Sequence, residues 1–258
     1  GGFGVVYKAQ QHHPVERAVA VKVLRTELAT AEVISRFRAE ARVLARMNHP
    51  AIARVLDAGI DDQHRPFVTT ELVDGLPIVE YCERHGLTLR ERIALMMDVC
   101  EAAHHAHQRA VIHRDIKPAN VLVEHVDGKH RARVIDFGIA KILEEGASDT
   151  QTRIGSRMGT PRYMSPEQVD GQDLGDVRTD VYALGVLLCE VLTSRVPRNP
   201  PPPGSASSSL RAMTATRPSQ LAGEAGSTIA QRSRELRGDL DRIVLKAVAI
   251  EADERYDS

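Results

Sequence analysis

The chain has 258 residues, of which 42% are apolar and 27% charged, and its formal net charge is −1. This length and composition predict one large domain or two lobes around a cleft, and they exclude a disordered or fibrous protein. With 34 Lys and Arg against 35 Asp and Glu, electrostatics gives no reason to expect binding to nucleic acid or to an anionic membrane. The three cysteines are far apart, so we expect small buried residues in a reducing compartment rather than a disulfide framework or a zinc site.

The longest apolar run, 181–192, has 12 residues and includes Glu190. It is too short to span a bilayer, so no membrane contact is expected within these residues. The chain begins at Gly1-Gly2 without an initiator Met. We therefore expect a piece of a longer protein, truncated at both ends, with any membrane anchor outside it.

Over the first 75 residues the pattern predicts strands and one helix. Strands are predicted near 5–7, 18–24, 52–58 and 66–72. The helix follows from a stripe at spacings of 4, 3, 4 and 3 that consists of Val33, Phe37, Glu40, Leu44 and Met47.

After Asp74-Gly75 the sequence predicts mostly helix. Apolar helices are expected near 89–103, 178–193 and 240–250, and two short strands near 121–123 and 133–135 flank the turn residues Asp127-Gly128. The segment 200–226 is rich in Pro, Ser, Ala and Gly. We interpret 198–234 as a flexible insertion.

Two charged residues occupy positions where an apolar side chain is expected. Glu40 lies inside the apolar stripe of its helix, and Lys22 shares a strand face with Ala18, Ala20 and Leu24. A half-buried carboxylate and a half-buried ammonium each need a partner, so we expect Lys22 and Glu40 to form an ion pair. The alternative is that each side chain extends separately to water.

The glycines at the start of the chain indicate a phosphate-binding turn. Gly1, Gly2 and Gly4 can bring backbone N–H groups close to an anion, although glycine clusters are more often tight turns. The following Val5-Val6-Tyr7 continues as a strand. This excludes a dinucleotide-binding turn, which needs a helix directly after the glycines.

The segment His113-Arg114-Asp115-Ile116-Lys117-Pro118-Ala119-Asn120 predicts a loop rich in polar side chains. Pro118 and the packed charges exclude a regular helix, so a carboxylate, an ammonium and an amide are presented together. Asp136-Phe137-Gly138 follows 21 residues after Asp115, at the end of a predicted strand. Asp136 is a natural ligand for a hard cation, and Asn120 could supply a second oxygen.

These motifs resemble the eukaryotic-type protein Ser/Thr kinases, in particular their bacterial branch. The resemblance covers nearly the whole chain and adds three segments: Gly159 to Glu167 resembles the end of an activation segment, with Ser165 where the usual motif has Ala; Asp180 to Gly185 resembles the buried central helix; and Arg255 resembles the late arginine that pairs with the Glu167 position. In three respects the chain departs from the family: the first glycine of the loop is absent, the last helix is absent, and 194–234 is longer than the usual docking helix.

The resemblance implies an α+β, two-lobed protein-kinase fold for 1–258, with a small β-rich N-lobe that carries one helix and a larger, mostly helical C-lobe. The N-lobe and hinge would cover 1–73 and the C-lobe 74–258. The implied activity is transfer of the γ-phosphoryl group of MgATP to Ser or Thr hydroxyls of protein substrates, in bacterial signalling, with ATP as cosubstrate and Mg²⁺ as cofactor.

The resemblance also implies roles for individual residues. The catalytic residues would be Asp115 as base, Lys117 and Asn120; the metal ligands would be Asn120 and Asp136. The ATP-binding residues would be Gly1, Gly2, Gly4, Val6, Ala20, Lys22, Glu40, Thr70 as gatekeeper, Glu71 and Val73. Lys117 together with Thr160 implies Ser/Thr acceptors, and regulation would involve Arg114 with phosphorylated Thr150 or Thr152.

The same resemblance implies a cytoplasmic catalytic domain, whose parent protein could be tethered to a membrane elsewhere, and self-association for autophosphorylation. Two alternatives stay open. A pseudokinase would bind nucleotide or act as a scaffold without chemistry, although Lys22, Asp115, Asn120 and Asp136 are all present. A small-molecule phosphotransferase of related fold is not expected to carry the Gly159 to Glu167 segment.

Four further residues have a structural and a functional interpretation. His104 and His107 share a helical face, but no carboxylate or thiol at ligand spacing completes a zinc site, so packing or solvation is favoured. His113 is expected to be structural and to lie beneath Phe137. Asp180 is either a helix N-cap or, as the resemblance favours, a partner of the catalytic-loop backbone.

Overall fold

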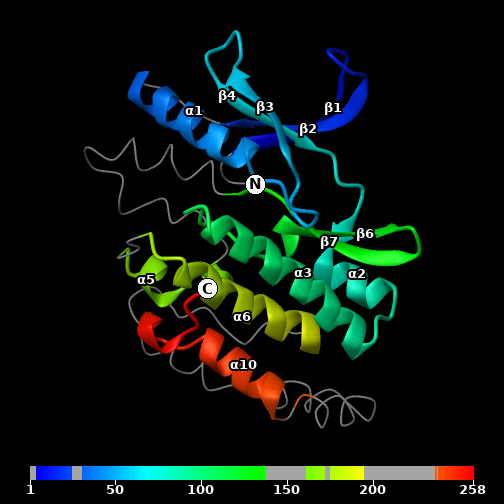
Figure 1. Cartoon of the computed structure of the whole chain (residues 1–258), viewed down its shortest axis with the longest axis vertical. Helices are drawn as coiled ribbons and strands as arrows, with labels where there is room; N and C mark the ends of the chain where they lie inside the picture. The colour runs from blue at the N-terminus through cyan, green and yellow to red at the C-terminus, as the bar shows by residue number, and fades with distance from the viewer. Residues whose placement is uncertain (1–3, 25–30, 138–160, 172–174, 195–235, 237) are drawn as a thin grey trace.

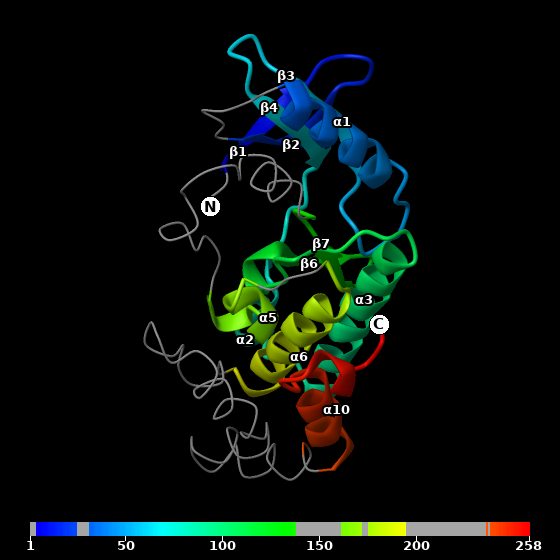
Figure 2. The ribbon, with the colours of Figure 1, turned by 90° about the vertical axis from the view of Figure 1, so that its left-hand side faces the viewer.

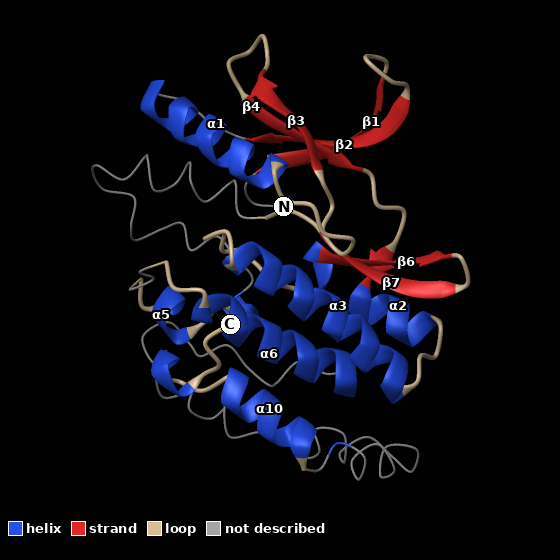
Figure 3. Cartoon of the chain, viewed as in Figure 1, coloured by secondary structure: helices blue, strands red, loops and turns tan. Residues whose placement is uncertain are grey.

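The computed structural model describes residues 4–24, 31–137, 161–171, 175–194, 236 and 238–258. These residues form a two-lobed α+β fold, with most of the strands in one lobe and most of the helices in the other (Figures 1 and 3). The expected insertion at 198–234 lies outside the described residues.

The smaller lobe is a four-stranded antiparallel sheet with one helix against it (Figure 1). Its elements are β1 (Gly4–Gln11), β2 (Arg17–Leu24), α1 (Ala31–Ala45), β3 (Val55–Ile60) and β4 (Pro66–Glu71), and the strand order is β1-β2-β4-β3. Leu24, Phe37 and Val68 form the buried core between helix and sheet. Phe37, from the predicted apolar stripe of α1, therefore faces the sheet, whereas Leu44 of the same stripe packs in the main core cluster.

The larger lobe contains a small sheet and the main helices. The sheet consists of β5 (Leu76–Pro77), β6 (Val121–Val126) and β7 (Lys129–Val134), in that order. The helices are α2 (Ile78–Arg84), α3 (Leu89–His107), α5 (Pro166–Val169), α6 (Arg178–Thr193) and α10 (Asp239–Ala247), with short 3₁₀ turns at Pro118–Asn120, Pro161–Tyr163 and Ala252–Glu254. No helix in the described ranges combines the length and apolar character that crossing a membrane requires.

The buried helix α6 is the centre of this lobe, and it lies between α3 and α10 (Figure 2). Twelve of its residues are buried. At Gly185 the neighbouring helix comes so close that a Cβ atom would lie 2.7 Å from the Cβ of Ala247 and 2.8 Å from a methyl group of Val248. Gly185 therefore permits the close packing of α6 on the end of α10.

The structure confirms the predicted order of elements and changes some of their limits. The helix predicted at 178–193 and the hairpin around Asp127-Gly128 are present. The strand predicted from residue 52 begins only at Val55, because the preceding residues bond to the other lobe: the amide of Ala53 donates to Val134 O over 2.9 Å.

The expectation of three buried cysteines is wrong for Cys100, which is exposed.

Candidate active site

The catalytic-loop residues form one bonded cluster. The ammonium of Lys117 lies 2.7 Å from a carboxylate oxygen of Asp115. The amide nitrogen of Asn120 donates to the backbone oxygen of Asp115 over 2.7 Å and to its Oδ2 over 3.0 Å. Pro118 begins a 3₁₀ turn, where its missing N–H removes no needed hydrogen bond, so this turn brings Asn120 back to Asp115.

Asp180 holds the start of this loop from the first turn of α6. Its carboxylate, 1% exposed, accepts the backbone amide of His113 over 2.8 Å at one oxygen and that of Arg114 over 2.8 Å at the other. Arg114 has φ of 61°, a backbone conformation that needs such support. This decides between the two interpretations of Asp180: it contacts the catalytic-loop backbone and does not serve as the N-cap.

Asp136 follows β7 and is tied to the catalytic loop through the backbone. The amide of Ile135 donates to Asn120 O over 2.9 Å, and the imidazole of His113 lies 3.0 Å from Ile135 O. The ring of His113 also contacts that of Phe137, with ring centroids 4.6 Å apart, which confirms its expected structural position. The carboxylates of Asp115 and Asp136 are thus carried by segments that share one hydrogen-bonded framework.

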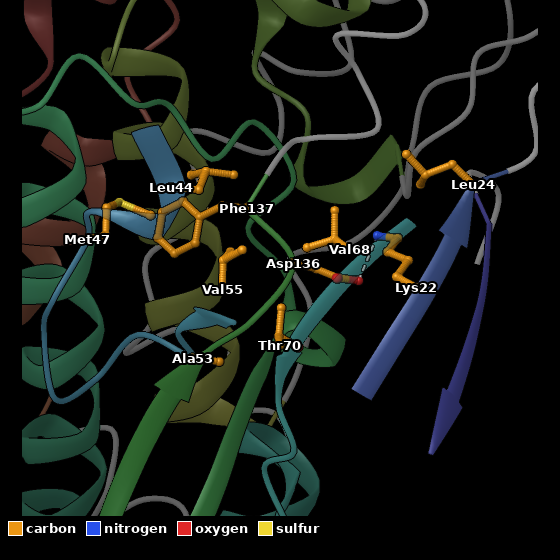
Figure 4. A pocket seen from close by; sticks show the side chains of 10 residues that line it. All are labelled: Lys22, Leu24, Leu44, Met47, Ala53, Val55, Val68, Thr70, Asp136 and Phe137. Atoms are coloured by element: carbon orange, nitrogen blue, oxygen red, sulfur yellow. Dashed lines mark hydrogen bonds and ion pairs between the residues drawn. The ribbon is translucent and has the colours of Figure 1, made fainter. Parts of the chain in front are cut away.

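The partner of Lys22 differs from the one expected. Its ammonium lies 2.8 Å from Oδ2 of Asp136, and Figure 4 shows this contact across the lobes. Glu40 is exposed, so the expectation of a half-buried carboxylate paired with Lys22 is wrong for this structure. Phe37 and Leu44 of the α1 stripe are buried in the core. The helix is rotated so that Glu40, which belongs to the same stripe, is exposed to solvent.

One face of the N-lobe sheet carries the residues expected to contact the nucleotide. In the strand register Val6 lies opposite Lys22, and Ala20 opposite Thr70, so these side chains point from the same face. Val6 is 54% exposed, so its side chain is accessible to a ligand. At Gly4 a Cβ atom would lie 2.4 Å from Val23 O, so glycine is required for this strand pairing.

A small cavity of about 20 Å³ lies behind Thr70 and Lys22 (Figure 4). Its other lining residues are mainly apolar and come from both lobes: Leu24, Leu44, Met47, Ala53, Val55, Val68, Asp136 and Phe137. Thr70 and Lys22 are themselves part of the lining of this cavity.

The end of the activation segment is anchored by a buried ion pair. The guanidinium of Arg255, 3% exposed, donates to both oxygens of Glu167 over 2.7 and 2.8 Å. Burial raises the pKa of Glu167, but hydrogen bonds and the charge of Arg255 outweigh it and lower the pKa below its ordinary value. The pairing implied by the resemblance is present.

Several expected site residues lie outside the described residues. They are Gly1, Gly2, Thr150, Thr152 and Thr160. For His104 and His107 packing or solvation was favoured over a zinc site, and among the described residues no group of three or more His, Cys, Asp or Glu side chains could hold a metal ion. Both imidazoles contact the hydroxyl of Ser258 instead.

His107 has a part in the site that was not predicted from the sequence. Its imidazole is 4% exposed and lies 2.9 Å from the Asp180 carboxylate that holds the loop. The available signal was a histidine at the end of an apolar helix just before the catalytic loop. A polar side chain there needs a buried partner, but the sequence does not show which one.

The donor set of the site fits Mg²⁺. Asp136 supplies a carboxylate that is 29% exposed, and Asn120 supplies an amide whose nitrogen is already used within the loop, which leaves its oxygen for a cation. Mg²⁺ in phosphoryl-transfer sites is bound by one or two such oxygen ligands together with substrate phosphates.

Comparisons with known proteins agree with this geometry. Residues 1–238 match the family described as the protein kinase domain. The Ser/Thr-protein kinase PknB of Mycobacterium tuberculosis is 38% identical over 262 residues, 99% of this chain and 39% of that protein. PrkC of Bacillus subtilis is 39% identical over 199 residues, 76% of this chain and 29% of that protein. The crystal structure of the Mycobacterium tuberculosis PknI kinase domain has a TM-score of 0.69 at 27% identity, and the match covers 100% of this chain and 88% of that one.

The chain thus spans 39% of the length of PknB, so the comparison concerns one part of such proteins. The family match, the identity to bacterial kinases and the arrangement of Asp115, Asn120 and Asp136 all lead to the same assignment. The chain belongs to the protein kinase family, in its bacterial Ser/Thr branch.

Proposed function

We propose that this chain is the catalytic domain of a bacterial protein Ser/Thr kinase, which transfers the γ-phosphoryl group of MgATP to hydroxyls of protein substrates. The observation that carries the proposal is the cluster of Asp115, Lys117 and Asn120 on a loop held by Asp180. A scaffolding pseudokinase has no need for this complete set of catalytic groups.

Asp115 orients the incoming hydroxyl and accepts its proton. The hydroxyl oxygen forms a bond to the γ-phosphorus while the bond from that phosphorus to the β–γ bridging oxygen breaks, and ADP leaves with the electron pair. The ammonium of Lys117, 2.7 Å from Asp115, stabilises the negative charge on the transferred group. Because both side chains belong to one short loop, they keep their relative positions during the reaction.

Phosphates and cation are held from the two lobes. Lys22 binds the α- and β-phosphates, and Asp136 with Asn120 binds Mg²⁺. When bound, Mg²⁺ neutralises charge on the phosphates and orients them. In this structure Asp136 forms an ion pair with Lys22. Nucleotide binding therefore breaks this pair, and both residues then contact MgATP. Glu40 can pair with Lys22 only if α1 moves toward Lys22.

The adenine base lies between Val6 and Ala20, with Thr70 as gatekeeper. The backbone oxygen of Glu71 and the backbone groups of Val73 contact its edge. The shared sheet face of Val6, Ala20 and Thr70 supports this placement. The N-lobe and hinge extend over 1–73 and the C-lobe over 74–258.

Regulation and acceptor choice belong to the activation segment. Lys117 with Thr160 favours Ser and Thr acceptors, and a phosphate on Thr150 or Thr152 pairs with Arg114. Autophosphorylation requires two copies to associate. The catalytic domain acts on protein substrates in the cytoplasm.

The test uses the complete protein with MgATP and a general protein substrate. We expect phosphoserine or phosphothreonine in the product, whereas Asp115→Asn abolishes transfer and leaves MgATP affinity within about threefold, because Asp115 acts in the transition state. Mass spectrometry of the activation segment checks phosphorylation at Thr150 and Thr152 in the same samples. Nucleotide binding without transfer in the wild type indicates a pseudokinase, and dominant phosphotyrosine contradicts the acceptor assignment.

A further inference from the structure

Glu71 has a side chain that the proposed catalytic roles do not use. Its carboxylate is 29% exposed and contacts two arginines from different segments. Nε of Arg54 lies 3.2 Å from Oε1, and the guanidinium of Arg133 donates to Oε2. Arg54 precedes β3 in the N-lobe, whereas Arg133 is on β7 in the C-lobe. The carboxylate therefore joins the two lobes.

Backbone hydrogen bonds strengthen the same junction. The amide of Glu71 donates to Arg54 O over 3.0 Å, and the guanidinium of Arg133 donates to Ile52 O over 3.3 Å. Next to them, Val134 N donates to Ala51 O over 2.8 Å. The segment 51–54 is thereby fixed to β7, and Glu71 is fixed to both. We call Arg54, Glu71 and Arg133 the hinge clamp.

The hinge clamp lies where the chain leaves the N-lobe sheet. Glu71 is the last residue of β4, and the residues 72–75 that follow form neither helix nor strand before β5 begins in the other lobe (Figure 1). A connection without regular hydrogen bonds has more backbone freedom than a strand. The side chain of Glu71 supplies a fixed point at the N-terminal end of this connection.

The charge and the burial of its residues make the structure of the hinge clamp sensitive to the substitution of any one of them. Arg133 is 20% exposed, and Glu124 is 3.6 Å away as a second carboxylate. Arg54 is 60% exposed, so water screens its pair with Glu71 more strongly. Among the described residues, removing Glu71 would leave the partly buried Arg133 with Ile52 O and with the more distant Glu124 as its carboxylate partner. The Glu71–Arg133 contact therefore dominates the hinge clamp.

We propose that Glu71 is a positioning residue for the adenine base: its carboxylate, held by Arg133 and Arg54, sets the orientation of the peptide groups of 71–73. The inference rests on the proposed function, in which the backbone of Glu71 and Val73 contacts the base. The side chain points to the arginines and leaves the backbone oxygen for the nucleotide. Base recognition is thereby linked to the relative position of the lobes.

The test compares Glu71→Gln, Arg133→Met and the double variant of the complete protein. We expect each single variant to raise both the KM for MgATP and the Kd for adenosine by about 5- to 10-fold, with kcat within about twofold, because a displaced hinge weakens base binding and not the chemical step. The double variant is no worse than either single one, since one interaction cannot be lost twice. Arg133→Lys, which keeps the charge, restores part of the affinity.

Arg131→Met is the matched control, because Arg131 is on the same strand and exposed. It removes the same charge and is expected to leave KM and the adenosine Kd unchanged. Adenosine has no phosphates, so its Kd reports base binding without Lys22 or Mg²⁺. Glu71→Gln preserves the size of the side chain, and its melting temperature verifies that the protein is folded.

The outcomes separate the two proposals. A wild type that binds neither adenosine nor MgATP overturns the proposed function and this inference with it. Normal wild-type transfer, with unchanged KM and adenosine Kd in both single variants, overturns only the inference. A fall in kcat at constant KM, or an additive double variant, also contradicts it, because the residues would then not act together on the base.

Discussion

Lys22 and Asp136 form an ion pair 2.8 Å long that joins β2 of the N-lobe to the segment after β7 of the C-lobe. Both side chains are partly buried, with exposures of 22% and 29%. The proposed cation ligand is therefore already close to the proposed phosphate ligand. In the proposed mechanism MgATP replaces this pair, because it supplies a phosphate for Lys22 and a cation for Asp136.

The first prediction concerns this pair. Lys22→Met is expected to lower phosphoryl transfer by at least about 100-fold, because the phosphates lose their positioning cation. Without nucleotide, Lys22→Met and Asp136→Asn should each lower the free energy of unfolding by about 1 kcal/mol, and a double-mutant cycle should show coupling. Urea unfolding of the nucleotide-free protein measures this. Independent effects of the two variants are the result that contradicts the pair.

The second prediction concerns Asp180 as the support of the catalytic loop. Asp180→Asn should lower kcat by about 10-fold or more, because one amide of the loop then faces an NH₂ group and Asp115 loses its position. The KM for MgATP should change by less than about threefold, since Lys22 and the hinge are unaffected. Steady-state kinetics at varied ATP measures both. A large rise in KM at constant kcat is inconsistent with this role.

The third prediction concerns the cavity behind Thr70. Thr70→Met fills the entrance, so inhibitors that extend past this residue should lose at least about 10-fold in affinity while the KM for ATP changes by less than about threefold. Paired inhibitors with and without the extending group form the control. Equal losses of affinity for the two inhibitors would contradict the prediction that Thr70 controls access to the cavity.

The fourth prediction concerns the contact of α6 with the end of α10. Gly185→Ala should lower the free energy of unfolding by about 1–3 kcal/mol, because the new methyl group meets Ala247 and Val248. Combining it with Ala247→Gly removes one of the colliding atoms and should make the substitution at Gly185 less costly. Thermal unfolding of the four proteins in this cycle measures the coupling. A stabilising Gly185→Ala would show that the helices can separate freely.

The fifth prediction is the pH dependence of the Glu167–Arg255 pair. The pKa of Glu167 is lowered in the folded protein, so its contribution to stability is present above the ordinary value of 4.5 and is lost as the pH falls through the folded pKa. Glu167→Gln should therefore lower stability at neutral pH and flatten its decline below about pH 4.5. Unfolding free energies measured from neutral to acidic pH check this. Parallel curves for variant and wild type would contradict the lowered pKa.

The sequence by itself was sufficient to predict the catalytic-loop residues and the main helices and strands. Asp115, Lys117 and Asn120 are only 5 residues apart, and the proline among them excludes a helix, so local chemistry determines their cluster. The helix Arg178–Thr193 could be predicted from its long, nearly continuous apolar run, which is typical of a helix that is buried on most sides.

Only the tertiary structure decided the partners of the charged residues. Lys22 and Asp136 are 114 positions apart, and Glu71 and Arg133 are 62 apart. The apolar stripe of α1 showed that Glu40 needed an explanation, but it did not determine how far the helix is rotated against the sheet. Helix rotation and lobe orientation are decided by packing over large apolar surfaces, whereas an ion pair contributes little energy and adopts the partner that this packing brings near.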